Sequence, residues 1–367
     1  MIEYKEFLRI PGPTPIPPRV MNAINTPMIY HRSESFGGVI ESIIKNGRNI
    51  FKTSGDILVF SATGRGVMEA TVVNSISPGE KVLVLVNGKF GDIFIEIAQK
   101  FGAIVNRLDF NWGEPVDTNY FEEYLKDNPE ISTVFVIHCE TSTGVVNDIK
   151  EIGRISNKYH KFLIVDAVSS LGGIDMNMDD WGIDLVCTAS QKALMTPPGL
   201  GVVAINSKAW QKIESSKNPR FYWDFHLYKE AQERKPKQTP FTSPVSLMLG
   251  LREAFEMINE EGIEHVINRH ERVAKFFRKE IKSKGFKLFP KNESDCANTI
   301  TSICTPEGFS SDKIIDMLLK KYHLRVANGI GKLKGKILRV GHMGYQADLL
   351  SNLAIANAIS EVFLQDK

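Results

Sequence analysis

The chain has 367 residues, 43% of them hydrophobic and 24% charged, which is the composition of a globular protein long enough for two domains and a sizeable core. Its 45 lysines and arginines almost balance its 43 aspartates and glutamates, so the formal charge of +2 excludes the basic field that marks a nucleic-acid partner. No apolar run approaches the ~18 residues of a membrane span, and residues 1–10 lack the apolar segment of a signal peptide. The 4 cysteines lie far apart without a CxxC pair, so we expect a soluble, cytoplasmic protein with no disulfide scaffold and no metal site.

The N-terminal segment is rich in proline. Its prolines stand at positions 11, 13, 15, 17 and 18. Proline is disfavoured in the interior of a helix and in a central strand. We therefore predict an extended N-terminal arm over residues 1–20 that packs against another part of the molecule.

From about residue 56 to 206, short apolar runs alternate with helical patterns. The predicted strands are Ile57–Phe60, Lys81–Val86, Thr133–Ile137, Phe162–Val165 and Leu185–Cys187. The predicted helices between them include Gly66–Ile76, Phe90–Phe101 and Ile149–Tyr159. Several strands are apolar at every position, as expected where both faces are covered. The pattern predicts an α/β fold with a mostly parallel sheet and flanking helices.

The C-terminal third has a different pattern. Residues 207–245 are polar and basic and predict loop and short helix. Further helices are predicted at Leu247–Glu260, Ile263–Ser283, Ser311–Tyr322 and Ala347–Phe363, and strands at Thr299–Cys304 and Ile337–Val340. We therefore divide the chain into the arm (1–20), a large α/β domain (21–254) and a small C-terminal α+β domain (255–367).

Two charged residues follow predicted strands of the large domain. Asp166 ends an apolar strand, at the edge where ligands bind to open α/β sheets, although an aspartate there also caps turns. Lys192 follows the next strand and precedes the rigid turn Met195–Gly201. A lysine at such a place can form a Schiff base, and an aspartate nearby can keep a pyridine nitrogen protonated. This pair is the minimum that a pyridoxal 5'-phosphate (PLP) site requires.

A phosphate-binding turn is predicted at Ser61–Gly66. Thr63 is placed to cap the following helix, and Gly64 and Gly66 permit a close approach of the backbone to a ligand. Threonine caps many helices where nothing binds. The turn therefore indicates a phosphate site only in combination with Asp166 and Lys192.

These residues belong to a longer series of motifs. In chain order they are PGPTPIPPRV (11–20), SATGRGVMEA (61–70), NGKFG (87–91), HCETSTGV (138–145), IVDAVSSLGG (164–173), SQKALMTPPGLG (190–201), QTPFTSPV (238–245) and LRVGHMG (338–344). The series resembles the class V, fold-type I PLP-dependent aminotransferases, in the branch of alanine/serine–glyoxylate or –pyruvate and 2-aminoethylphosphonate–pyruvate transaminases. The resemblance covers nearly the whole chain. It implies a mostly parallel sheet of the seven-stranded type.

The resemblance implies roles for the cofactor-binding residues. Lys192 would be the Schiff-base lysine and the acid–base that moves the proton, and Asp166 would pair with the pyridine nitrogen. Thr63, Gly64 and Gln191 would lie at the phosphate. Arg65 stands where relatives vary, and it either adds a cation near the phosphate or points away.

Further roles follow from the same resemblance. Phe90 would stack on the cofactor ring, although a packed core phenylalanine is the alternative. Thr141 would lie near the 3' oxygen of the ring. Thr239 and Thr242 would reach the phosphate from the neighbouring subunit, which implies a homodimer with the active site at its interface.

Arg339 matches the arginine that binds the substrate carboxylate, a planar anion that a guanidinium group binds through two hydrogen bonds. Gly12 and Arg32 are the other predicted substrate-binding residues, and Arg32 is alternatively structural. His342 is predicted either to line the pocket or to be structural. The sequence around Thr239 resembles the aminoethylphosphonate relatives, whereas that around Arg32 resembles the serine–glyoxylate side.

The function implied is transfer of an amino group from alanine or serine to glyoxylate or pyruvate, by a ping-pong aldimine/ketimine mechanism. The first alternative is a 2-aminoethylphosphonate–pyruvate transaminase. A cysteine desulfurase-like lyase is disfavoured because Ala327–Lys336 holds no cysteine and the stacking position holds Phe90 rather than histidine. A non-catalytic binding module would not need Lys192, Asp166 and Arg339 together.

Overall fold

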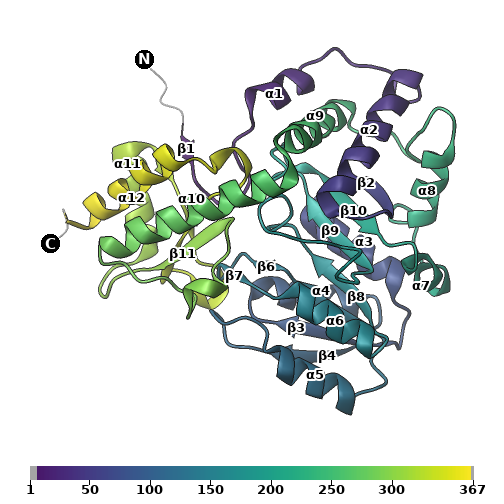
Figure 1. Cartoon of the computed structure of the whole chain (residues 1–367), viewed down its shortest axis with the longest axis horizontal. Coiled ribbons are helices and arrows are strands. Elements are labelled where there is room, and N and C mark those ends of the chain that lie inside the picture. The colour runs from purple at the N-terminus through teal and green to yellow at the C-terminus, as the bar shows by residue number, and fades with distance from the viewer. Residues whose placement is uncertain (1–5, 365–367) are drawn as a thin grey trace.

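The computed structural model describes residues 6–364, so residues 1–5 of the predicted arm and 365–367 of the predicted small domain lie outside it. Its centre is a seven-stranded sheet (Figure 1). In spatial order the strands are β2 (Asp56–Ala62), β10 (Gly199–Ile205), β9 (Leu185–Ala189), β8 (Phe162–Asp166), β5 (Thr133–Ile137), β3 (Lys81–Val86) and β4 (Ile104–Asp109). Only β10 runs in the opposite direction to the other six strands of this sheet, so the predicted, mostly parallel α/β fold is confirmed.

Helices cover both faces of this sheet, because successive strand residues point to opposite sides. Ile57 and Val59 join one hydrophobic core, and Leu58 and Phe60 join the other. The helices on the first face are α2 (Glu34–Phe51), α5 (Thr118–Asp127), α6 (Ile149–Lys158) and α9 (Val245–Glu261). Those on the second face are α3 (Gly64–Ser75), α4 (Lys89–Lys100), α7 (Ala209–Ser215) and α8 (Phe225–Glu233).

The C-terminal elements gather at one side of the molecule (Figure 1). A three-stranded antiparallel sheet contains β11 (Ile300–Cys304), β14 (Ile337–Gly341) and β13 (Ala327–Asn328). Around it lie α10 (Ile263–Ser283), α11 (Ser311–Tyr322) and α12 (Leu349–Leu364), and short 3-10 helices cover Glu293–Asp295, Gly331–Leu333 and Gly344–Gln346. A third hydrophobic core joins these elements. The predicted boundary at residue 254 falls within α9, and the division into domains stays a prediction.

The N-terminal arm joins the C-terminal elements to the central sheet. Strand β1 (Phe7–Leu8) pairs with β12 (Leu324–Arg325), and the chain then continues toward Lys192. The prediction of an extended segment to residue 20 is wrong at its end, because helix α1 (Pro18–Ile24) begins at Pro18. Proline is accepted in the first turn of a helix, where its missing N–H would have no partner.

In the described part of the chain, no helix has both the length and the apolar character needed to cross a membrane. The remaining short strands, β6 (Cys139–Glu140) and β7 (Val145–Val146), form a hairpin at the end of β5. This hairpin carries the HCETSTGV motif to the edge of the sheet where the candidate site lies.

Close packing of α3 on the sheet depends on Gly201 in β10. A Cβ atom at Gly201 would lie 2.1 Å from Val67 Cγ1 of α3. Since α3 begins directly after Thr63, this contact limits how closely α3, and with it the Ser61–Gly66 turn, approaches the sheet.

Gly201→Ala is expected to lower the free energy of unfolding by about 1–3 kcal/mol, because the added methyl group overpacks the core. Denaturation in urea measures the loss. Val67→Ala makes room for the methyl group, so the double variant should lose less stability than the two single variants summed. Strict additivity would show that this contact does not limit the approach of α3.

Candidate active site

The predicted site residues meet at one edge of the central sheet. Asp166 is the last residue of β8, Thr63 follows β2, and Lys192 follows β9. A cavity of ≈ 400 Å³ opens among these segments. Its lining contains the predicted residues Thr63, Gly64, Arg65, Phe90, Thr141, Asp166, Gln191 and Lys192, together with Met68, Ile137, Cys139, Val168 and Ser169.

The N-terminal arm packs directly on Lys192. The Thr14 N–H donates to Gln191 O at 3.0 Å, and Thr14 Oγ1 donates to Lys192 O at 2.9 Å. Lys192 Nζ donates to the carbonyl oxygen of Pro11. Gly12 has φ +119°, and a Cβ atom there would lie 2.7 Å from Lys192 Cδ. Glycine at position 12 therefore both permits the turn and leaves room for the lysine side chain.

Burial alters the charges of the two central groups. Burial and the nearby Arg339 guanidinium lower the pKa of Lys192 to about 8. Burial raises the pKa of Asp166 to about 7, although the Val168 N–H, which donates to Asp166 Oδ1 at 2.7 Å, opposes the rise. Burial thus shifts the pKa values of both groups toward neutral pH, where an amine such as Lys192 can take up and release a proton.

The start of α3 forms one wall of the cavity. Thr63 Oγ1 accepts the Gly66 N–H at 3.2 Å, which caps the helix as predicted from the sequence. Gly64 is close to the opposite wall, since a Cβ atom there would lie 3.3 Å from Val168 Cγ2. Beside them, Gln191 Oε1 is buried without a hydrogen-bond partner among the described residues. Helix N-termini attract anions through their free backbone N–H groups, whereas the free oxygen of Gln191 can accept only from a donor.

Arg339 approaches the cavity from β14. Its Nη1 donates to Thr141 O at 3.0 Å and its Nε to Asn328 O at 2.7 Å. The residue is only 7% exposed, and burial lowers its pKa to about 10. Thr141 itself lines the cavity, so Arg339 lies directly behind the cavity wall. Its guanidinium group has further N–H donors that these two hydrogen bonds do not use.

Gly12 and Arg339 lie next to lining residues, and four other predicted residues do not line this cavity. Arg32 Nη1 donates to Gln238 Oε1 at 2.7 Å. Thr239 Oγ1 donates to Phe241 O at 2.8 Å, and Thr242 is exposed. His342 is buried behind β14, where Asn352 and Thr301 lie 2.6 and 2.9 Å from its ring nitrogens, so the structural alternative describes it.

Sequence reasoning missed Cys139, Glu140 and Ser169. Cys139 and Ser169 line the cavity, and Thr141 Oγ1 donates to Ser169 Oγ at 2.5 Å. Glu140 is fully buried beneath Phe90 and accepts the Phe90 N–H at 3.0 Å. Cys139 and Glu140 lie in the HCETSTGV motif and Ser169 in the IVDAVSSLGG motif. The motifs therefore marked the right segments, but they did not show which of their residues line the cavity.

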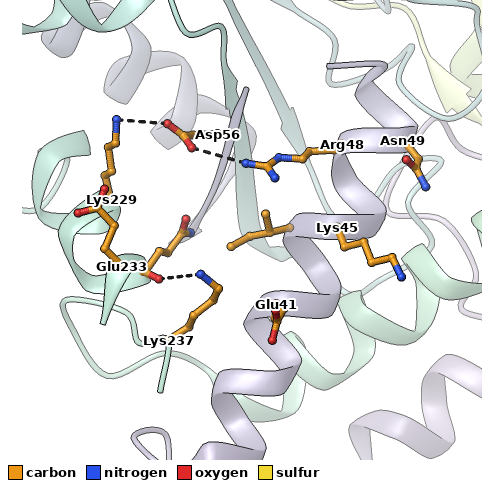
Figure 2. A pocket seen from close by; sticks show the side chains of 10 residues that line it. Glu41, Lys45, Arg48, Asn49, Asp56, Lys229, Glu233 and Lys237 are labelled. Atoms are coloured by element: carbon orange, nitrogen blue, oxygen red, sulfur yellow. Dashed lines mark hydrogen bonds and ion pairs between the residues drawn. The ribbon is translucent and has the colours of Figure 1, made fainter. Parts of the chain in front are cut away.

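A second cavity of ≈ 510 Å³ lies between α2 and α8, and none of the predicted site residues lines it. Figure 2 shows Arg48 and Lys229 pointing toward Asp56 from these two helices, with ion-pair distances of 3.8 and 3.5 Å. Both cations pair with the same carboxylate, and we place the candidate site at the smaller cavity, which the predicted residues line. Among residues 6–364, no cluster of histidine, cysteine, aspartate and glutamate side chains could hold a metal ion.

Comparison with known proteins identifies the family. The family model "Aminotransferase class-V" matches residues 7–333. The chain belongs to the class-V aminotransferases. The predicted family is confirmed, and the chain is an enzyme of the aminotransferase type, in a family that depends on PLP.

The chain is 40% identical over 353 residues to an uncharacterized aminotransferase of Methanocaldococcus jannaschii, covering 95% of this chain and 91% of that protein. It is 36% identical over 354 residues to the L-aspartate–glyoxylate aminotransferase of Paracoccus denitrificans, covering 95% and 89%. The solved structure of an alanine–glyoxylate aminotransferase from Nostoc sp. has a TM-score of 0.94 and 28% identity, covering 99% and 96%.

The pH dependence of Lys192 acetylation tests its electrostatic surroundings. In cofactor-free protein, we expect reaction of Lys192 Nζ with acetic anhydride to rise to half its maximum near pH 8, because only the neutral amine attacks. Arg339→Gln removes a neighbouring positive charge, so the midpoint should move to higher pH. Peptide-resolved mass spectrometry measures both. Arg107→Gln, which removes an exposed arginine paired with Asp92, is the control, and an unmoved midpoint in Arg339→Gln would refute the electrostatic explanation.

Proposed function

We propose that this chain uses PLP to transfer an amino group from a small amino acid, alanine or serine, to glyoxylate or pyruvate, in two half-reactions. The observation that carries the proposal is the meeting of Lys192 and Asp166 in one cavity, with Arg339 bonded to its wall. A carrier of amino groups needs an amine, a partner for a ring nitrogen and a site for a carboxylate. Lys192 and Asp166 line this cavity, Arg339 is bonded to its wall, and its volume of ≈ 400 Å³ is in the range of small-molecule sites.

The lining residues fit the parts of this cofactor. Thr63, Gly64, Arg65 and Gln191 would hold the phosphate, because they combine a helix N-terminus, a cation and an amide that can donate through its Nε2. Phe90 would lie against the ring and Thr141 near its 3' oxygen. Bound PLP supplies an aldehyde that takes up the amino group and a ring that withdraws electrons from the reacting carbon.

Lys192 and Asp166 would handle the protons. Since the pKa of Lys192 is about 8, its amine exists in both protonation states near neutral pH, and Nζ can remove and return the proton on the substrate α-carbon. The carboxylate of Asp166 would accept a hydrogen bond from a protonated ring nitrogen. That opposite charge would lower the pKa of Asp166 again and keep it ionised.

Arg339 would bind the carboxylate of both substrates, so that one site serves the donor and the acceptor. Its unused N–H groups suit a planar anion bound through two hydrogen bonds. Gly12 and Arg32 would complete this part of the site. The related proteins differ in donor, which is aspartate in the name of the Paracoccus enzyme and alanine in that of the Nostoc enzyme.

A panel of donors tests the substrate. Alanine or serine alone, without an oxo acid, should discharge the visible absorbance of the PLP-loaded protein, and glyoxylate or pyruvate should restore it. Lys192→Ala should lose turnover in both directions and serves as the control. Discharge by 2-aminoethylphosphonate but by neither amino acid would move the protein to the alternative function, and a protein that takes up no PLP would exclude both.

We also propose a cytoplasmic homodimer with the active site at the interface. Phe221 is 73% exposed, and the ring of Tyr222 stacks on Phe241 with centroids 5.1 Å apart. Tyr222 Oη donates to Ser61 O at 3.4 Å, so this aromatic surface adjoins the Ser61–Gly66 turn. An exposed apolar surface beside a site favours cover by a second copy of the chain, whose Arg32, Thr239 and Thr242 would reach the cavity. The described cysteines are all free, which supports a reducing compartment.

Complementation between inactive variants tests the shared site. Lys192→Ala and Thr242→Asp should each be inactive, the second because a carboxylate would face the phosphate. In a randomly paired mixture, half the dimers are mixed and each has one intact site, so about a quarter of the activity should return. Recovery no greater than the sum of the two variants would exclude a shared site, and each variant paired with itself is the control.

A further inference from the structure

Glu140 is a buried carboxyl group that none of the roles above uses. It is 0% exposed, in the short hairpin β6–β7 behind the cavity. Oε1 accepts the Ser142 N–H at 3.0 Å and the Ser142 hydroxyl at 2.6 Å, and Oε2 accepts the Phe90 N–H at 3.0 Å. All of these partners are donors, so the network suits an ionised carboxylate, which only accepts.

Helix α4 has no cap of its own. Its N-cap residue is Gly88, which has no side chain to accept the free N–H groups of the first turn. Glu140, 50 residues away in sequence, accepts one of them, from Phe90. Capping from a distant segment satisfies the backbone and also places a negative charge at the positive end of the helix.

Gly88 is shaped to receive this carboxyl group. A Cβ atom at Gly88 would lie 2.2 Å from Glu140 Cγ and 2.7 Å from Oε2. Its φ of 177° is open to any residue, so contact with Glu140 is the constraint on this position. The glycine of the NGKFG motif and the glutamate of the HCETSTGV motif therefore form one packed unit.

The same network orders two residues that line the cavity. Phe90 lies in the first turn of α4, so its ring position follows from the capped backbone. Ser142 Oγ also accepts the Lys89 N–H at 3.0 Å, which ties α4 to the loop that carries Thr141. One carboxyl group thus joins the segment of Phe90 to the segment of Thr141.

We propose that Glu140 is a positioning residue that caps α4 from the β6–β7 hairpin and thereby fixes the ring of Phe90 against the cofactor. The inference rests on the proposed function, since it assigns a PLP ring to the space beside Phe90. Burial raises the pKa of Glu140, and the hydrogen bonds from Ser142, Phe90 and Gly91 oppose that rise. Glutamine is a poor substitute, because its amide nitrogen would have to face N–H donors.

Hydrogen exchange in cofactor-free protein tests the capping directly. Glu140→Gln should speed exchange at the amides of Phe90 and Gly91. Asp148→Ala is the control for loss of a cap elsewhere: Asp148 caps α6 by accepting the Glu151 N–H at 3.0 Å, and alanine has no acceptor, so exchange should rise at the start of α6 and not at α4. Unchanged exchange at Phe90 and Gly91 in Glu140→Gln would overturn the proposal.

A double-mutant cycle with Phe90→Leu tests the consequence for the cofactor. Glu140→Gln should raise the Kd for PLP about three- to ten-fold, the range of one stacking contact, and change the visible circular dichroism of the bound cofactor. In the Phe90→Leu background the same substitution should add little, because the ring it positions is gone. Fully additive effects on Kd would show that Glu140 does not act through Phe90.

A replacement variant and a test of the wild-type protein separate failure of this proposal from failure of the proposed function. If Glu140→Gln does not fold, Glu140→Asp replaces it, because the shorter side chain keeps the charge but should not reach Phe90. A wild-type protein that binds no PLP would overturn the proposed function, whereas the exchange experiment would still decide whether Glu140 caps α4.

Discussion

The burial of Lys192, Asp166 and Arg339 around one cavity is the constraint on which the rest of the site depends. A charge removed from water is costly unless polar groups replace the solvent. Here backbone groups do so: Pro11 O for Lys192, the Val168 N–H for Asp166, and Thr141 O and Asn328 O for Arg339. None of these charges is cancelled by a salt bridge within the described part of the chain. The cavity therefore keeps an amine and a carboxyl group with shifted pKa values, and Arg339 lies beside it as a buried cation.

This arrangement explains why so many distant segments meet there. The backbone partners come from the N-terminal arm, the turn after β8, the hairpin after β5 and strand β13. The parallel strands of the central sheet end at a common edge, so their following turns converge. The arm and β14 also reach this edge, through Pro11 and Arg339, and each joins the C-terminal elements to the cavity. Movement of either would alter the surroundings of Lys192 or Arg339.

The sequence predicted the alternation of strands and helices in the large part of the chain because strands covered on both faces are apolar throughout. It left out α2, β4 and β10, although all three are regular elements. Strand β4 carries Asn106, Arg107 and Asp109 at the sheet edge, so its hydrophobic pattern is weak. Strand β10 begins Gly-Leu-Gly, which reads as the end of a turn, and its antiparallel direction follows only from the pairing with β2 and β9.

The sequence by itself determined the family and the fold class and predicted the chemistry of Lys192, Asp166 and Arg339, because motifs retain both residue type and order. Only the tertiary structure decided which residues share the cavity, that Arg339 reaches it through Thr141, and that Glu140 caps a helix 50 residues away. It also separated His342, which bonds to Asn352 and Thr301, from the site. The reason is physical: a side chain's pKa and partners depend on burial and on groups from other segments, and spacing along a chain contains neither.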